Sequence, residues 1–287
     1  MTKKLLIPMD GSPVSFCAFD YGVALARMLD SVIEVLFVVD RRKTQIPFIY
    51  AGGAYDIAYE RIYIPPDQEL KRFYDRLNKD LHEFAENVVE KCRSMAEKEG
   101  IELHAQVREG FPSHEIEEYA HSADMVILGR RGENADYRRE TIGSTTEEVI
   151  RKSPRPVLVC GEGEYRKPER ILIPYDASRS AENALQFYIG EFSKVASNLV
   201  LLCAEGVEKN FATFEHELEY LEQHDIDVET VTDEEAPVHA IGRLADEHAV
   251  DLIIMGSHGR HKIVDYLLGS TTIHVLRKSN VPVLVVY

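Results

Sequence analysis

Two glycine-rich clusters in this chain have the residue types that bind phosphate groups. The second is the more regular: Gly256 and Gly259 stand three apart, nine residues separate Gly259 from Gly269, and Ser270 and Thr271 follow. Glycines let bare backbone N–H groups approach an anion, and a helix beginning at the hydroxyl residues adds partial positive charge. The alternative is a purely structural turn and helix cap. Because the whole run follows a strand and precedes a helix and a further strand, its pattern favours phosphate binding.

The first cluster departs from that spacing. Gly129 and Gly132 are again three apart, but ten residues separate Gly132 from Gly143. The extra residue either bulges harmlessly or misplaces the loop, so the second cluster is the stronger candidate. The loop also carries four arginines, which either pair bidentately with phosphate oxygens or lie in solvent, balanced by nearby acidic residues. They are Arg130, Arg131, Arg138 and Arg139.

Each cluster is accompanied by a single aspartate that follows an apolar run, Asp10 in the first half and Asp176 in the second. Neither has a second acid or base beside it in the sequence, so the pattern does not argue for general acid–base catalysis. The motifs GxxxxGK[ST] and GxSxG are absent. His258 and His261 lack a third ligand, so no metal site is expected. These residues indicate binding and not catalysis.

The elements that must position these residues follow a strand–helix alternation that occurs twice. Uninterrupted apolar strands between amphipathic helices are typical of a parallel sheet covered by helices on both faces. We therefore predict an α/β protein with two domains, 1–162 and 168–287, joined by the polar segment Glu162–Pro168. The predicted strands are Leu5–Met9, Val32–Val39, Glu102–Val107, Met125–Leu128 and Pro156–Cys160, then Arg170–Pro174, Asn198–Cys203, Asp227–Val231, Leu252–Met255 and Val281–Val286.

The two copies differ in length between the second strand and the long helix. Asp176 lies 166 residues after Asp10, whereas Gly256 lies only 127 after Gly129, so the first half carries 166 − 127 = 39 extra residues. They fall within about 41–77, a segment too aromatic for a plain disordered linker. The segment is either a lid or hairpin on its own domain, or an arm that reaches across the other half or a partner chain.

The run from Gly256 to Ser270, in its strand–helix setting, resembles the signature G-x2-G-x9-G-[ST] of the ATP-binding members of the universal stress protein family. The resemblance covers essentially the whole chain, once per half. It implies two tandem open five-stranded parallel sheets with helices on both faces. It also implies that the fifth strands, Pro156–Val159 and Pro282–Val286, pair antiparallel, so that the two domains form an intrachain pseudo-dimer and hide two exposed edges.

The resemblance further implies an adenine-nucleotide site in each half, built from the aspartate after strand one, the end of strand two and the glycine motif. In the second half these positions are Asp176, Ala204, Gly256, His258, Gly259, Arg260, Gly269, Ser270 and Thr271. In the first half they are Asp10, Val39, Gly129, Arg131, Gly132, Gly143, Ser144 and Thr145. The expected ligand is ATP, AMP or ADP, with or without magnesium, and the expected role is regulatory, in the stress response, with at most weak ATP hydrolysis. The alternatives are a nucleotide-free dimeric interaction scaffold of the same fold and a hydrolase or transferase that uses bound ATP.

The composition limits the classes of partner that this protein is expected to bind. A net charge of −16 argues against a nucleic-acid or anionic-membrane surface, since an acidic protein gains no counterion release there. No apolar stretch approaches the roughly 20 residues that span a bilayer, and the run before Asp10 is too short for a signal peptide. Four cysteines are expected to be buried free thiols, which fits a reducing cytoplasm: Cys17, Cys92, Cys160 and Cys203. Association of two chains into a homodimer is left open.

Overall fold

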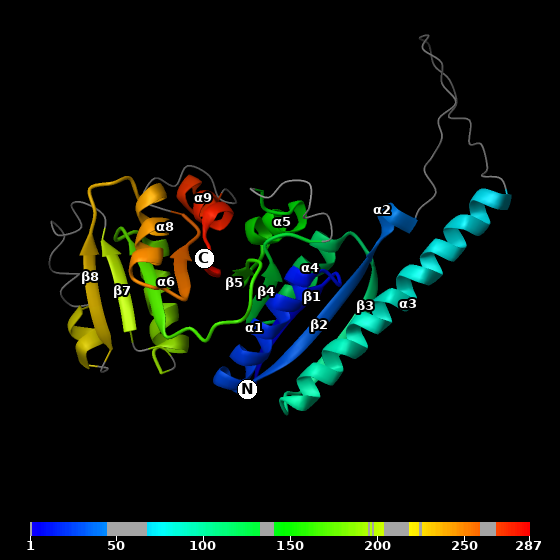
Figure 1. Ribbon diagram of the computed structural model, residues 1–287, viewed down its shortest axis with the longest axis horizontal. Helices are drawn as coiled ribbons and strands as arrows, with labels where there is room; N and C mark the ends of the chain where they lie inside the picture. The colour runs from blue at the N-terminus through cyan, green and yellow to red at the C-terminus, as the bar shows by residue number, and fades with distance from the viewer. Residues whose placement is uncertain are drawn as a thin grey trace, which may run out of the picture.

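The computed structural model describes residues 2–44, 68–132, 141–194, 196, 198–203, 218–223, 226–258 and 268–287. In the first half, strands and helices alternate as predicted (Figure 1). The elements are β1 (Lys3–Met9), α1 (Pro13–Leu29), β2 (Ser31–Asp40), α2 (Arg41–Thr44), α3 (Gln68–Lys98), β3 (Leu103–Gly110), α4 (Pro112–Ala120), β4 (Met125–Gly129), α5 (Ser144–Lys152) and β5 (Val157–Cys160). Both ends of the predicted insertion are thus helical, and its residues 45–67 lie outside the described part of the chain.

The second half repeats this order. Its elements are β6 (Arg170–Tyr175), α6 (Arg179–Phe187), the π-helical turn η2 (Tyr188–Phe192), β7 (Asn198–Cys203), β8 (Asp227–Thr232), α8 (Pro237–Glu247), β9 (Leu252–Gly256), α9 (Ser270–Lys278) and β10 (Val283–Val286). Residues 218–223 are also helical, within a helix that the sequence predicts over Phe211–His224. The rest of that predicted helix lies outside the described residues.

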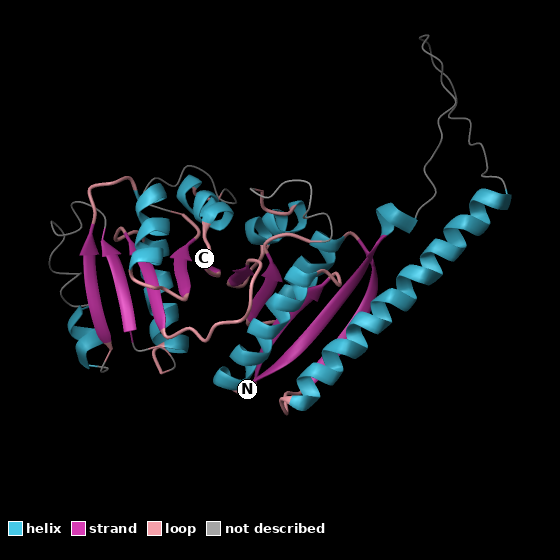
Figure 2. Cartoon of the chain, viewed as in Figure 1, coloured by secondary structure: helices cyan, strands magenta, loops and turns pink. Residues whose placement is uncertain are grey.

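The strands form one ten-stranded sheet in the order β3-β2-β1-β4-β5-β10-β9-β6-β7-β8. Within each half every neighbouring pair is parallel. The halves meet at β5 and β10, which run antiparallel with Leu158 opposite Leu284. Figure 2 shows the strands of the two halves side by side. The predicted fold class, two parallel units joined as an intrachain pseudo-dimer, is therefore confirmed. The pairing also removes two strand edges that would otherwise be exposed.

Two apolar layers cover the two faces of this sheet. Because side chains alternate along a strand, Leu5 and Ile7 enter one layer and Leu6 enters the other. Helices α1, α3 and α6 contribute to the first layer, and α4, α5, α8 and α9 contribute to the second. Each layer contains residues of both halves, so the core continues across the junction. The four cysteines are buried and free, and burial raises the pKa of Cys92 to about 12.

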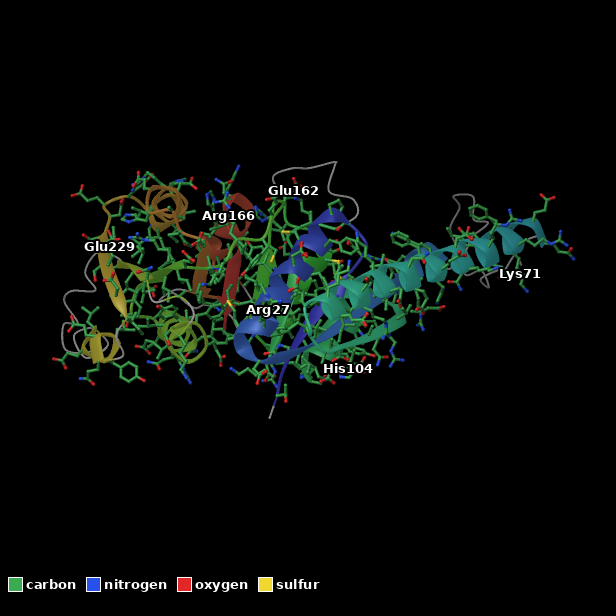
Figure 3. All side chains as sticks on the ribbon, turned by 60° about the horizontal axis from the view of Figure 1, so that its bottom comes forward. Arg27, Lys71, His104, Glu162, Arg166 and Glu229 are labelled. Carbon is green, nitrogen blue, oxygen red and sulfur yellow. The ribbon has the colours of Figure 1, made fainter. Side chains whose placement is uncertain are left out.

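The segment that joins the halves is attached to α1. Tyr165 packs edge-on against Tyr21 with ring centroids 4.8 Å apart, and the backbone N–H of Arg166 donates to the Tyr21 hydroxyl at 3.2 Å. Figure 3 labels Glu162 and Arg166, which lie on this segment. The contacts with Tyr21 hold the later residues of the segment against the first half and leave Glu162 near the ends of the strands.

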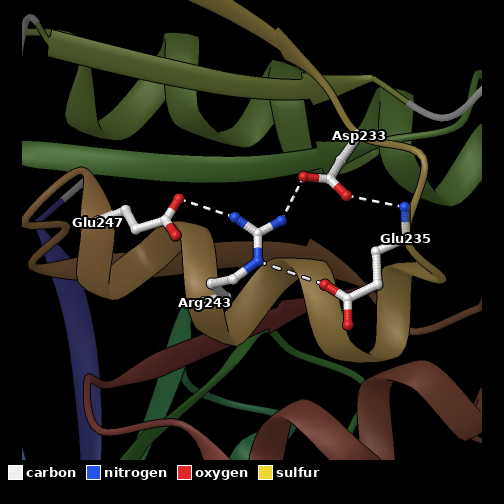
Figure 4. A network of polar contacts seen from close by, with 4 residues as sticks. All are labelled: Asp233, Glu235, Arg243 and Glu247. Atoms are coloured by element: carbon white, nitrogen blue, oxygen red, sulfur yellow. Dashed lines mark hydrogen bonds and ion pairs between the residues drawn. The ribbon is translucent and has the colours of Figure 1, made fainter.

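A polar network fixes the turn into α8 in the second half (Figure 4). Asp233 accepts the backbone N–H of Glu235 at 2.8 Å, and the guanidinium of Arg243 pairs with Asp233, Glu235 and Glu247. These contacts raise the pKa of Arg243, chiefly through its hydrogen bonds to Glu247 and Asp233. The network joins the end of β8 to α8 at the edge of the sheet where the strands end.

Helix α3 reaches past the sheet that it covers (Figures 1 and 3). Its C-terminal part is buried at Val88, Val89 and Cys92, whereas Phe73, near its N-terminus, is 59% exposed. No helix in the described residues is long and apolar enough to cross a membrane.

Candidate functional site

A cavity of about 440 Å³ lies at the carboxyl ends of β1, β2 and β4 in the first half. Parallel strands bring their carboxyl ends to one edge, which is where open α/β sheets bind ligands. All eight candidate residues of the first half line this cavity. They are Asp10, Val39, Gly129, Arg131, Gly132, Gly143, Ser144 and Thr145. The sequence analysis ranked this half second, and the structure brings its whole candidate set together.

Local hydrogen bonds fix Asp10 where β1 ends. Its Oδ1 accepts the backbone N–H of Ser12 at 2.9 Å, and Gly11 between them has a φ of +81°, a conformation that glycine adopts without strain. Ser12 then caps α1 by accepting the N–H of Ser15 at 3.2 Å, and Pro13 occupies the first helical turn. The carboxylate is therefore held at the cavity by the same turn that begins the helix.

The two glycines after β4 have different reasons to lack a side chain. A Cβ at Gly129 would lie 2.9 Å from Val14 Cγ1 and 3.1 Å from the carbonyl oxygen of Arg131, so close packing of α1 on β4 requires this glycine. A Cβ at Gly132 would instead lie 2.5 Å from Asp10 Oδ2. Gly132 thus brings the loop backbone directly against the carboxylate at the cavity. The fold accounts for Gly129, whereas Gly132 belongs to the site.

The N-terminus of α5 faces the same cavity. Gly143 is its N-cap and supplies no side-chain cap, and its own N–H donates to the carbonyl of Arg130 at 2.9 Å. Thr146 ties the helix to the strand by donating to the carbonyl of Gly129 at 2.9 Å. Ser144 and Thr145, in the first turn, line the cavity with N–H groups for which the helix itself has no acceptor. An anion is stabilised in that position by the N–H groups and the helix dipole.

Arg131 is a cationic residue that lines the cavity. Its side chain is only 13% exposed, and its Nη2 lies 3.2 Å from Glu162 Oε1. Its Nη1 is buried and has no hydrogen-bond partner among the described residues. A buried donor without a partner destabilises the fold by about 1–3 kcal/mol, more when it is charged. A phosphate oxygen in the cavity would supply the missing acceptor.

Arg130, its neighbour, has a different role from either sequence-based interpretation. It is neither in solvent nor among the residues that line the cavity; it is 9% exposed, and its Nη2 donates to the carbonyl of Ser279 at 2.6 Å. Burial lowers its pKa, and the charge of Arg131 lowers it further. Arg130 therefore serves the junction between the halves. Arg138 and Arg139 lie outside the described residues.

Several residues of the cavity were missed by sequence reasoning. Asp40 and Arg42 lie where β2 ends, and Arg42 Nε is 2.9 Å from both carboxylate oxygens of Asp40. Burial raises the pKa of Asp40 and the hydrogen bonds from Arg42 lower it, with a net downward shift. Leu81 and Phe84 of α3 supply an apolar wall, and Phe84 packs edge-on against Phe37 at 6.0 Å. The charged run after β2 was the available signal for the first pair.

The second half has the same frame with different side chains. Asp176 Oδ1 accepts the N–H of Ser178 at 3.0 Å, the N–H of Gly269 donates to Ser257 at 2.9 Å, and Thr272 donates to Gly256 at 3.2 Å. These bonds match those of Asp10, Gly143 and Thr146. Helix α9, like α5, has a glycine N-cap that supplies no side-chain hydrogen bond, so Ser270 and Thr271 lie in an uncapped first turn.

His258 stands where the first half has Arg131. Its Nδ1 is 2.7 Å from the hydroxyl of Ser257, its backbone N–H donates to Ser180 at 3.3 Å, and its Nε2 has no described partner. A Cβ at Gly256 would lie 2.6 Å from the carbonyl oxygen of Ser180, so packing requires this glycine as it does Gly129. The remaining candidates, Ala204, Gly259 and Arg260, lie outside the described residues.

Comparison with known proteins gives one consistent family. The sequence matches the family model described as the universal stress protein family over residues 1–161 and 195–287. Universal stress protein Slr1230 of Synechocystis sp. is 29% identical over 290 aligned positions, which cover 98% of this chain and 99% of that protein. Universal stress protein MJ0531 of Methanocaldococcus jannaschii is 30% identical over 172 positions, covering 58% of this chain and 84% of that protein.

A solved structure extends the likeness to the whole fold. A universal stress protein of Archaeoglobus fulgidus superposes with a TM-score of 0.73, covering 98% of this chain and 97% of that one at 24% identity. The shared architecture therefore includes both halves of the chain and not the first half alone.

Proposed function

This chain belongs to the universal stress protein family, and we propose that the cavity of its first half binds an adenine nucleotide. The observation that carries the proposal is Arg131, which lines the cavity and whose buried Nη1 has no partner among the described residues. The uncapped first turn of α5 lies at the same cavity and also favours an anion. A phosphate group satisfies both features at once.

The dimensions and lining of the cavity suit such a ligand. Its volume of about 440 Å³ falls within the range of about 300–1,000 Å³ that is usual for small-molecule sites. Arg131, Ser144 and Thr145 would hold the phosphates. Asp10 and the backbone of Val39 would hold the adenine, next to the apolar wall formed by Leu81 and Phe84.

We assign this site a regulatory role and not a catalytic one. The two carboxylates that line it among the described residues have structural partners, since Asp10 accepts the N–H of Ser12 where α1 begins and Asp40 is paired with Arg42. A general base must lie within hydrogen-bond reach of the proton it removes, and we assign these two carboxylates to structure and ligand binding instead. Occupancy of the site would thus act as a signal, with ATP, ADP or AMP as the ligand and magnesium bound through the phosphates where ATP binds.

Calorimetric titration of the purified protein tests the proposal. The ligands are ATP with magnesium, ADP, AMP and adenosine, and the variants are Arg131→Met and Gly132→Val. We expect Arg131→Met to weaken phosphorylated ligands by about tenfold or more, because a hydrogen bond to a charged group contributes about 1.5–3 kcal/mol. Arg151→Met is the matched control, since Arg151 pairs with Glu147 on α5 and does not line the cavity.

Two outcomes would overturn the proposal. One is a wild-type protein that binds no adenine nucleotide at millimolar concentration. The other is binding that Gly132→Val leaves intact and Gly259→Val abolishes, which would assign the ligand to the second half. Thermal melts of each variant establish that it is folded.

An interaction scaffold without nucleotide is the second candidate, and one observation favours it. Gly129 and Gly256 are both required by packing against the helix that follows the first strand of their half, so this part of the motif needs no ligand. Under this reading Arg131→Met and Arg151→Met would be indistinguishable in every titration.

A further inference from the structure

Glu162 is the acidic partner of the cavity arginine. Gly129 of β4 lies opposite Cys160 of β5, and two residues beyond each strand end stand Arg131 and Glu162. Arg131 Nη2 and Glu162 Oε1 are 3.2 Å apart, and the two side chains differ in exposure, at 13% and 63%. The cation is therefore fixed at the cavity, while the carboxylate reaches it from solvent.

The backbone around Glu162 permits this carboxylate to leave. Glu162 stands between two glycines, and Gly163 has a φ of +139° with open space where a Cβ would be. The segment is next held at Tyr165, through its contact with Tyr21. Because Glu162 is 63% exposed, solvent screens the carboxylate side of this ion pair, and a phosphate with more negative charge can compete with it for Arg131.

We propose that Glu162 competes with the phosphate of the ligand for Arg131 and so sets the affinity of the site for phosphorylated ligands. This inference rests on the proposed function. A phosphate at Arg131 Nη1 meets a guanidinium whose charge Glu162 already partly neutralises at Nη2, and it is repelled by that carboxylate, and both effects lower its affinity. An uncharged nucleoside in the same cavity leaves the Arg131–Glu162 pair in place. Glu162, although outside the glycine motif, is a specificity-determining residue that discriminates by ligand charge.

Binding then changes the segment between the halves. Where a phosphate displaces the Glu162 carboxylate, the stretch from Gly161 to Tyr165 loses its ion pair with Arg131 of the first half. A ligand shifts an equilibrium only by its differential affinity for the two states. The free energy of breaking the Arg131–Glu162 pair on binding should therefore equal the gain in binding free energy when the pair is removed by mutation.

The test compares Glu162→Gln with Glu164→Gln by calorimetric titration with ATP, AMP and adenosine. Both variants remove one negative charge from the same exposed segment, and only Glu162 is paired with Arg131. We expect Glu162→Gln to bind AMP and ATP about two- to fivefold more tightly and to bind adenosine as the wild type does. Glu164→Gln should change each affinity by less than half as much.

Hydrogen exchange of the peptide over Gly161–Pro168 is a second measurement, which does not depend on the overall stability of the protein. Exchange should rise when AMP binds to the wild type, and ligand-free Glu162→Gln should already show the raised level. Equal effects of the two glutamine variants, or tighter binding of adenosine by Glu162→Gln, would overturn the competition while leaving nucleotide binding intact. Failure of every ligand to bind the wild type would instead overturn the proposed function itself.

Discussion

The Nη2 atom of Arg130 donates to the carbonyl of Ser279 at 2.6 Å, and this bond joins the loop after β4 in the first half to the end of α9 in the second. Ser279 caps the C-terminus of α9, where a cation also interacts favourably with the helix dipole. The second half makes a reciprocal contact, because the hydroxyl of Tyr287 donates to the carbonyl of Ile150 in the last turns of α5. Each half therefore completes a helix end of the other.

Replacing Arg130 with methionine should destabilise the protein without removing the cavity. The variant keeps an apolar stem of similar length but loses a charge-assisted hydrogen bond and leaves the Ser279 carbonyl without that partner. We expect the free energy of unfolding to fall by about 1–3 kcal/mol, measured by chemical denaturation.

Arg131→Met is the control for that measurement. Arg131 makes one partially exposed ion pair, whereas Arg130 makes a buried hydrogen bond across the junction, so removal of Arg131 should cost less than half as much stability as removal of Arg130. A loss of stability in Arg131→Met equal to that in Arg130→Met would contradict the division of roles between these two neighbours.

Alanine substitutions should separate the structural glycines from the others. A methyl group at Gly129 meets the backbone of Val14 and Arg131 at 3.1–3.3 Å, and overpacking of this kind costs about 1–3 kcal/mol. Gly143 has a φ of −61°, and a Cβ there would come no nearer than 3.5 Å to a neighbouring atom, so Gly143→Ala should cost less than about 1 kcal/mol. Thermal melts of the two variants compare these losses of stability. A larger loss in Gly143→Ala than in Gly129→Ala would show that packing at β4 is not the reason for Gly129.

Arg130 and Arg131 also show how much of the candidate site could be predicted from the sequence. The eight first-half candidates could be named in advance because the family resemblance implies them, and they lie together because the carboxyl ends of parallel strands meet at one edge. The role of Arg130 could not, because its partner is 149 residues away and becomes a neighbour only through the pairing of β5 with β10. The resemblance implied that pairing, but no local pattern indicates which side chain crosses it.

The apolar wall of the cavity could not be predicted from the sequence, for a different reason. The helical period of α3 identifies the face that meets the sheet, and Leu81 lies on it. It does not reveal where along the helix the sheet ends, so Leu81 and Phe84 could be read only as core. The position of the helix start was obscured by the preceding insertion, which has no counterpart in the second half.

Buried tyrosines predict a loss of stability in alkaline solution. Burial raises the pKa of Tyr21 to about 12, from an ordinary value of 10.0, and burial also raises those of Tyr188 and Tyr287. The unfolded chain releases these protons near pH 10 while the folded chain retains them, so the unfolded state binds fewer protons and stability falls as pH rises from about 10 toward 12. Well below pH 10 these tyrosines are protonated in both the folded and the unfolded state, so they contribute no pH dependence to stability.

Denaturant titrations across this range, with phenolate absorbance as a second signal, measure the effect. Tyr21→Phe should make the decline shallower, since one of the raised groups is gone, although it also removes the acceptor for the N–H of Arg166. An unchanged slope in Tyr21→Phe would show that other groups control the alkaline transition.

The two ends of the cavity should respond to different parts of the ligand. Phe84 lies beside Gly11, where a Cβ would be 2.5 Å from its ring, and so stands next to Asp10 at the adenine end. Phe84→Ala should weaken adenosine and AMP equally, by about two- to tenfold, because an aromatic contact contributes about 0.5–1.5 kcal/mol. Arg131→Met should weaken AMP and leave adenosine unchanged. The double variant measures the coupling of the two contacts, and additive losses for AMP would show that they act independently. A Phe84→Ala variant that loses AMP but keeps adenosine would place the phosphate and not the base beside α3, and would reverse the orientation of the ligand in the cavity.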